Sequence, residues 1–352
     1  MFVHTKFTEL VGIEHPIVQE GMGPLGTAKL AAAVSNAGGL GTVSIPGMTK
    51  DPAEGGRIIA SHVEMAASLT DRPFAVNIPV GSNDRGEILP ISDAYIRAII
   101  DVRQREPEVE KRLRVVTTSA GNPAPFRGMI ADTSLIHMHK VASTRQAVKA
   151  QELGVDVVIA SGYEMGGHTH ATPVHTFVLV PNVTAEVDVP VLLSGGARDG
   201  RTLAAALSLG AAGVAMGTRF IATEDDFDWH PAYGDRIIAA EEGDDILFPG
   251  VYGPARGLHT GGVTELEAMI ADQRDPEEVT RWKDEALIRA QQEGDLEHGL
   301  IAAGQVSSGI HSRVRIAEFV PEMAAEAGRI LSQLGSAVTS EPATAADERS
   351  PA

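Results

Sequence analysis

The chain alternates short apolar runs with helical stretches, and this alternation constrains its fold more than any other feature. Each run is nearly continuous in apolar and β-branched residues, which is typical of strands buried on both faces of a parallel sheet. Helical stretches lie between the runs, for example at 27–36, 52–69, 144–153 and 199–209. We predict eight strands, at residues 16–19, 39–44, 73–80, 113–119, 134–140, 156–161, 189–194 and 213–217.

Eight strand–helix units favour an α/β fold of the closed (β/α)8 type, the TIM barrel, over an open doubly wound sheet. An open sheet would show five or six strands with its glycine-rich turn after the first strand. In this chain the strongest glycine-rich turn follows the seventh predicted strand. The order of elements therefore predicts a barrel.

The strand–helix rhythm stops after Phe220. Residues 225–299 are charged and helical in character, interrupted by a glycine- and proline-rich stretch at 248–262. We predict that this segment is a helical insertion, or subdomain, over the catalytic face. The barrel itself is predicted to consist of residues 1–224 and 300–336.

The end of the chain divides into a helix and a tail. A helix at 320–334 is expected to pack on the barrel. The tail, residues 337–352, is small, polar and proline-containing. We expect it to be disordered, because it has too little apolar surface to offset the cost of ordering.

Composition excludes several classes of function. The 352 residues include 29 basic and 47 acidic side chains, a net charge of −18, which argues against a nucleic-acid or anionic-membrane partner. The absence of cysteine excludes disulfides, thiolate nucleophiles and cysteine-ligated metal sites. The N-terminus carries acidic residues and has no continuous apolar segment, and no run is long enough to cross a bilayer. We expect a cytoplasmic protein.

The loops after the seventh and eighth strands predict a phosphate site. Function in a barrel lies at the carboxyl ends of the strands. Ser194, Gly195 and Gly196 form a turn in which backbone amides can approach an anion, and a helix beginning near Asp199 points its positive end at the same place. After the next strand, Gly217 and Thr218 add amides and a hydroxyl. One glycine pair alone would indicate only a chain turn, but two such turns on consecutive strands favour phosphate binding.

A histidine preceded by two glycines, His168 in "GYEMGGHTHA", is the candidate for chemistry. Such a histidine can be a turn residue, a metal ligand, a core residue or a catalytic base. A metal site with His170 and His175 is disfavoured because no carboxylate triad lies beside them, so we predict no bound metal. Glu164 could orient His168, but we favour a structural role for it. Asn77, at the end of the third strand, can donate to and accept from the edge of a heterocyclic ring.

These segments together resemble the nitronate monooxygenase family, formerly called 2-nitropropane dioxygenases. Relatives of that family include flavin-dependent enoyl-ACP reductases and NADH:quinone reductases. The likeness runs from His15 to about Leu334. It rests on five motifs in family order, "PIVQEGMG…LAAAVSNAGGLG", "PFAVNIPV", "GYEMGGH", "SGGARDG…LSLGAAGVAMGTRF" and "GDLEHGLIAAGQVSSGI".

The resemblance implies FMN bound at the carboxyl face of the barrel, where the protein positions the cofactor and tunes its electronics. By this likeness Asn77 would contact the isoalloxazine, the backbone of residues 21–23 would line the ring, and the two glycine-rich turns would hold the phosphate. The cofactor-binding residues implied are Gly21, Met22, Gly23, Asn77, Ser161, Gly166, Gly167, Ser194, Gly195, Gly196, Met216, Gly217 and Thr218.

The same resemblance assigns a catalytic role to His168. "GYEMGGH" is similar to the Glu-x-Gly-Gly-His segment of the family, whose histidine lies over the flavin. His168 would remove a proton α to a nitro group or, when protonated, hold the charge of a nitronate. Three features depart from the family pattern. Ser161 stands where many members carry Gln, His170 is expected to narrow the pocket, and the stretch at 248–262 is longer than the family core requires.

Two enzymatic hypotheses follow from the resemblance. In the first, the protein oxidises alkyl nitronates with O2 to a carbonyl compound and nitrite. In the second, NAD(P)H reduces the flavin, which then reduces a quinone or an enoyl-CoA or enoyl-ACP thioester. A thioester carrier would favour basic residues at the mouth, for which Arg85, Arg219 and Arg256 are candidates, although each could equally be a solvated charge or part of an ion pair. A third hypothesis is a non-catalytic barrel that binds a sugar phosphate or has lost its cofactor. A homodimer is the assembly that we expect.

Overall fold

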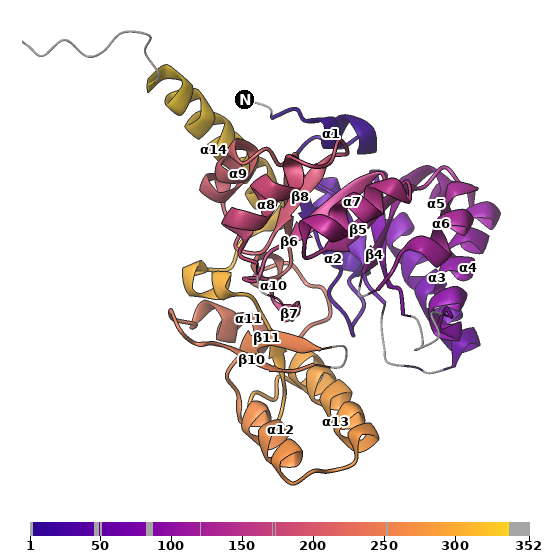
Figure 1. Cartoon of the computed structure of the whole chain (residues 1–352), viewed down its shortest axis with the longest axis vertical. Coiled ribbons are helices and arrows are strands. Elements are labelled where there is room, and N and C mark those ends of the chain that lie inside the picture. Colours follow the sequence, from indigo (N-terminus) through magenta and orange to yellow (C-terminus); the bar gives the residue numbers. More distant parts are fainter. Residues whose placement is uncertain are drawn as a thin grey trace, which may run out of the picture.

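The computed structural model describes residues 3–45, 49, 51–81, 87–119, 121–170, 172, 174–250 and 253–337 (Figure 1). All eight predicted strands are present, and all are paired in parallel. They are β1 (Ile17–Gln19), β2 (Gly41–Val43), β3 (Phe74–Pro79), β4 (Leu113–Ser119), β5 (Ile136–Val141), β6 (Val157–Ser161), β8 (Val191–Ser194) and β9 (Gly213–Met216).

The eight strands form a closed barrel. Their order is β1-β9-β8-β6-β5-β4-β3-β2, so each strand lies beside the next strand of the rhythm and β9 lies beside β1. The two ends of this order meet where Val18 pairs with Leu40. Here the Gln19 amide donates to the Leu40 carbonyl, and the Leu40 amide donates to the Ile17 carbonyl, each at 2.9 Å. The predicted (β/α)8 barrel is confirmed.

Helices cover the outside of the barrel, and their starts follow from local sequence. Asp199 caps α9 through a capping box with Thr202, Ser143 caps α7, and Asp51 caps α3, whose first residue is proline. The helices of the barrel are α1 (Lys6–Val11), α2 (Ala28–Asn36), α3 (Pro52–Leu69), α4 (Pro90–Arg105), α5 (Pro107–Arg112), α6 (Ala124–Ala131), α7 (Thr144–Glu152), α8 (Thr176–Thr184), α9 (Gly200–Ser208), α10 (Thr218–Ile221) and α14 (Ile316–Ala337).

The interior of the barrel changes from apolar to polar along the strands. The part nearer the amino ends of the strands is a buried apolar cluster that includes Met138 and Ile159 together with Phe7 of α1. Because side chains alternate along a strand, the residues two positions further on face the same interior. These are Lys140 on β5 and Ser161 on β6. The carboxyl end of the barrel therefore presents polar groups above a dry core.

The segment after α10 forms a separate layer below the barrel in Figure 1, with an antiparallel sheet and a core of its own. The helices expected in it are present, but none of its three strands was predicted. The layer contains α11 (Pro231–Ile238), β10 (Asp245–Pro249), β11 (Pro254–Leu258), α12 (Gly261–Ala271), α13 (Pro276–Ile288), the π-helical turn η1 (Arg289–Glu293), β12 (Ile301–Ala302) and the 3-10 turn η2 (Gln305–Gly309). The exact domain boundaries stay a prediction.

The stretch expected to be a loop at 248–262 is in fact largely the β10–β11 hairpin and the start of α12. Its strand β11 also pairs with a two-residue strand in the loop after β6, β7 (Gly167–His168). Ala255 lies opposite His168 in this pairing, and Arg256 lies opposite Gly167. The insertion is therefore hydrogen-bonded directly to the segment that carries the candidate histidine.

The helix expected at 320–334 is the central part of α14. The carboxylate of Glu326 accepts from the Gly200 amide at 2.8 Å, and Phe319 contacts Phe220 edge to face. The tail expected to be disordered lies outside the described residues, apart from Ala337 at the end of α14. Within the described ranges, no helix is long and apolar enough to span a bilayer.

Candidate active site

A cavity of about 1340 Å³ opens at the carboxyl ends of the barrel strands. Its walls come from the strand-end loops, from β7 and from the insertion. All fourteen residues predicted for the site line this cavity, although the role of each stays a prediction. They are Gly21, Met22, Gly23, Asn77, Ser161, Gly166, Gly167, His168, Ser194, Gly195, Gly196, Met216, Gly217 and Thr218.

The two glycine-rich turns form a cradle of amides on one side of the cavity. Gly195 and Gly196 have φ values of +98° and +86°, a conformation that favours glycine, and they lead into α9. Gly217 and Thr218 directly follow β9, and α10 begins at Thr218. Within the described part of the chain, the amides of these four residues donate to no protein acceptor. Such amides beside a helix N-terminus suit a phosphate group.

Thr218 is shared between the cradle and the rest of the wall. Its Oγ1 accepts from the Gly304 amide at 3.0 Å, which leaves its hydroxyl proton to donate to a ligand. A Cβ placed on Gly217 would lie 3.3 Å from Sδ of Met22, so the loops after β1 and β9 are in contact. The cradle and the 21–23 loop are thus adjacent walls of one site.

The floor of the cavity holds polar atoms that need partners. Ser161 is 4% exposed, and its Oγ has no hydrogen-bond partner among the described residues. Gly21 allows the backbone to approach Asn77, because a Cβ there would lie 2.4 Å from the Asn77 Cβ. A buried polar atom without a partner is costly, so Ser161 indicates a ligand that reaches the floor.

An ion pair on this floor was not predicted from the sequence. Nζ of Lys140 lies 2.8 Å from Oε2 of Glu20, and both side chains are largely buried. The other carboxylate oxygen, Oε1 of Glu20, has no partner within the described ranges. Both residues stand at strand ends, as Asn77 does. Applying the strand-end rule to every strand would have found them.

His168 lies on β7, on the wall formed with the insertion. Gly166 is required because a Cβ would lie 2.5 Å from the Ala303 carbonyl carbon, and Gly167 has a φ of +73°. Gly166 therefore allows the loop to pack closely against Ala303, and Gly167 allows the chain to turn before the histidine. The His168 ring faces the cavity. The surrounding protein and, to a lesser degree, the charges of Lys283 and Lys140 lower the pKa of His168.

Comparison with known proteins agrees with this geometry. The family model described as "Nitronate monooxygenase" matches residues 4–326. The chain belongs to the nitronate monooxygenase family. Membership assigns it to the flavin-dependent oxidoreductases.

Three relatives of this family member show its range. It is 32% identical over 290 residues to a probable nitronate monooxygenase of Staphylococcus saprophyticus, covering 73% of this chain and 79% of the relative. FabK from Thermotoga maritima is 34% identical, with a TM-score of 0.83 over 96% of this chain and 100% of FabK. A (3aS,4S,5R,7aS)-5-hydroxy-7a-methyl-1-oxo-octahydro-1H-indene-4-carboxyl-CoA dehydrogenase of Rhodococcus jostii is 38% identical over 223 residues, which are 63% of this chain but only 56% of that relative.

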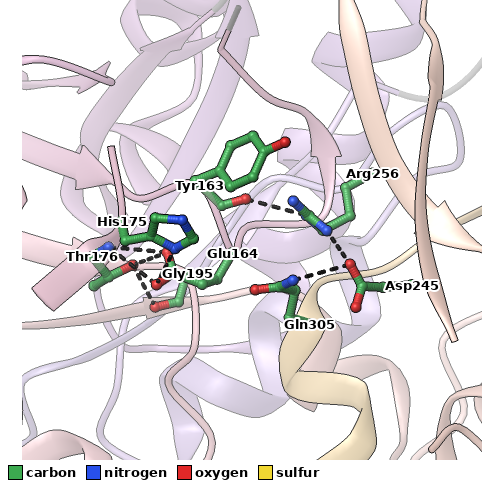
Figure 2. A network of polar contacts seen from close by, with 8 residues as sticks. All are labelled: Tyr163, Glu164, His175, Thr176, Gly195, Asp245, Arg256 and Gln305. Carbon is green, nitrogen blue, oxygen red and sulfur yellow. Dashed lines mark hydrogen bonds and ion pairs between the residues drawn. The ribbon is translucent and has the colours of Figure 1, made fainter. Parts of the chain in front are cut away.

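In this nitronate monooxygenase family member, Glu164 has a structural role (Figure 2). Its carboxylate accepts from the Thr176 amide at 3.0 Å and from the Thr176 hydroxyl at 2.7 Å, at the start of α8. Nδ1 of His175 lies 3.3 Å from the same carboxylate. Thr176 also donates to the Gly195 carbonyl at 3.2 Å. Glu164 therefore fixes the loop between β6 and the cradle.

Arg256 attaches this loop to the insertion (Figure 2). Its guanidinium is 3% exposed, forms an ion pair with Asp245, donates to the Tyr163 carbonyl at 3.1 Å and lies 4.7 Å from the centre of the Tyr163 ring. Gln305 donates to the same Asp245 carboxylate at 3.2 Å. The network holds β7, the insertion and the turn after β12 in one arrangement.

Neither Arg219 nor Arg256 lines the cavity, and Arg256 forms an ion pair, which is one of the alternatives expected from the sequence. Arg219 is 5% exposed and donates to the carbonyls of Ala222 and Ser312, behind the cavity wall. Arg85 lies outside the described residues. The described basic side chains that do line the cavity, besides histidines, are Lys140, Arg145, Lys149 and Lys283.

The remaining histidines of the motif have local partners. His170 also lines the cavity, with Nε2 lying 3.4 Å from Nε2 of Gln146 and Nδ1 accepting from the Thr172 amide at 3.2 Å. The described residues contain no group of three histidine or carboxylate side chains arranged to hold a metal ion.

Proposed function

We propose that the protein is an FMN-dependent oxidoreductase that oxidises alkyl nitronates with O2 to a carbonyl compound and nitrite. The observation that carries this proposal is the position of His168. It stands on the wall of the cavity that the amide cradle also lines, with a lowered pKa that keeps its ring neutral at neutral pH. A neutral imidazole beside a flavin site can accept the proton that a nitroalkane loses.

FMN rather than FAD is the cofactor that the residues suit. The cradle of Gly195, Gly196, Gly217 and Thr218 suits one phosphate group. The unpartnered hydroxyl of Ser161 and the amide of Asn77 are available for the edge of a flavin ring. The bound flavin would supply the electron transfer from the nitronate to O2. Because Ser161 is shorter than the Gln of many family members, its contact with the ring is expected to be weaker or bridged by water.

The polypeptide would contribute proton transfer, charge and exclusion of water. His168 would accept the proton from the carbon α to the nitro group. For a substrate that arrives as the nitronate, the neutral ring would serve as a hydrogen-bonding partner, so the positive charge must come from elsewhere. Lys283 lines the same cavity and would supply it, whereas the charge of Lys140 is paired with Glu20. The cytoplasmic location and the homodimer expected from the sequence stay predictions.

The test begins with the cofactor. Extraction and mass spectrometry of the purified protein should identify FMN. The flavin absorbance is then followed without oxygen after separate additions of propyl-2-nitronate, NADH and NADPH. We expect a response to the nitronate alone, and nitrite release once O2 is admitted.

Variants then test the histidine with neutral 2-nitropropane as substrate. His168→Asn should reduce the rate of flavin reduction about 100-fold or more, the usual contribution of a general base. His170→Asn removes a histidine two positions away on the same loop and serves as the matched control. Equal rates of flavin reduction in His168→Asn and His170→Asn would contradict the role of His168 as the general base.

A second candidate is a flavin-dependent dehydrogenase or reductase of CoA thioesters. The reductase would receive its electrons from NAD(P)H. The cavity of about 1340 Å³ exceeds the usual size of a single-ligand site, about 300–1,000 Å³. Arg145 and Lys149 are exposed on α7 at its edge, where phosphates of a CoA carrier could lie. Rapid bleaching by NADH or NADPH would favour this candidate over the first.

A further inference from the structure

Lys283 is a buried lysine of the insertion, and its sequence neighbour Asp284 lines the same cavity. Lys283 lies on α13, is 7% exposed and lines the cavity. Its Nζ donates to the Gly250 carbonyl at 2.9 Å, and no carboxylate of the described residues lies within ion-pair distance of it. Burial lowers the pKa of Lys283, while the charge of the adjacent Asp284 acts in the opposite direction.

Lys283 and His168 share one part of the wall. A Cβ placed on Gly250, whose carbonyl receives Lys283, would lie 3.0 Å from Cδ2 of His168. The β10–β11 hairpin that contains Gly250 is in turn paired with β7, which carries His168. The insertion and the barrel thus each contribute one side chain to the same corner of the cavity.

Holding an ammonium group out of water without an ion-paired carboxylate is unfavourable, and a contact to one carbonyl offsets that cost only in part. An arrangement of this kind is favourable when a ligand brings the missing negative charge. A planar anion with two oxygens could accept a hydrogen bond from the ammonium and present its other edge to His168.

We propose that Lys283 and His168 form an anion subsite for the two-oxygen planar group of the substrate, a nitronate or a carboxylate of the same shape. This inference rests on the proposed function, since it concerns the same cavity. Lys283 supplies the fixed charge that sets specificity for an anion, and His168 takes up or shares a proton. The insertion therefore selects the charge of the substrate.

The test is the binding of a non-reactive probe to the purified, flavin-loaded protein. Propanoate has the shape of a small nitronate, and propanamide is its neutral counterpart. Calorimetric titration should show that wild-type protein binds propanoate at least about tenfold more tightly than propanamide. Lys283→Met should abolish that preference, whereas Lys283→Arg should retain most of it. Lys111→Met removes the same charge from an exposed position on α5, outside the residues that line the cavity, and should keep the preference.

A second measurement separates charge recognition from a merely structural role of Lys283. Removing a positive charge near His168 should raise the pKa of that imidazole, which can be followed by NMR with labelled histidine in wild type and Lys283→Met. An unchanged pKa of His168, or equal propanoate affinity in wild type and Lys283→Met, would overturn the proposal. So would a wild-type protein that does not distinguish propanoate from propanamide. Because propanoate is not oxidised, these outcomes are independent of whether nitronates are the substrate.

Discussion

Two buried histidines on β5 predict a specific loss of stability in mild acid. His137 is fully buried and His139 is 4% exposed, and both rings contact Oγ1 of Thr118 at 2.8 Å. Burial, followed by the charges of His139 and Arg127, lowers the pKa of His137 to about 3. Burial lowers the pKa of His139 to about 4, with the hydrogen bond to Thr118 acting in the opposite direction.

The sign and the size of the effect follow from linkage. In the unfolded chain both histidines take up protons as the pH falls through about 6.5, whereas in the folded protein they stay neutral down to about pH 4. The free energy of unfolding therefore falls as the pH falls below 6.5. Between pH 7.5 and 5.5, each histidine should account for about 1 to 2 kcal/mol, and the pair for about 3 kcal/mol.

The assay compares urea unfolding of wild type and of a His137→Gln/His139→Asn double variant at these two pH values. Gln and Asn place a polar atom near the ring nitrogen that contacts Thr118 in each case, and neither side chain titrates. The double variant should lose about 3 kcal/mol less than wild type. His62→Asn, on α3, removes a histidine outside the barrel and should behave as wild type. An equal loss in wild type and double variant would refute the reasoning.

Three further predictions concern the site. Reduction of the flavin by a neutral nitroalkane should decline only as the pH falls through the lowered pKa of His168, below its ordinary 6.5, and His168→Asn should lack this limb of the pH–rate profile. Gly196→Ala and Gly243→Ala both place alanine at a φ near +90° and should each lower the free energy of unfolding by about 1–2 kcal/mol. Only Gly196→Ala should weaken the retention of FMN, measured by dialysis. Arg256→Met breaks a buried ion pair and should cost about 3–5 kcal/mol, against less than 1 kcal/mol for the exposed Arg274→Met, by urea unfolding.

The barrel could be read from the sequence because its signals are local. Each strand is a short apolar run, and each helix has its own cap, so neighbouring residues suffice to predict them. In a barrel, the loops after the parallel strands meet at one end. This rule predicts that residues as distant in sequence as Gly21 and Thr218 lie in one place. That rule needs no knowledge of side-chain contacts, and the predicted residues do line one cavity.

Other parts of the site depend on contacts between distant segments, and only the tertiary structure decided them. The strand β7 exists because β11 pairs with it, and a two-residue strand has no periodicity of its own. An exposed and a buried arginine are not distinguished by the sequence alone. The buried position of Arg256 depends on its contacts with Asp245 and Tyr163. Lys283 belongs to the cavity because α13 folds back over the barrel mouth. Pairing and burial of this kind are properties of packing between elements, whereas the strands and turns follow from properties of adjacent residues.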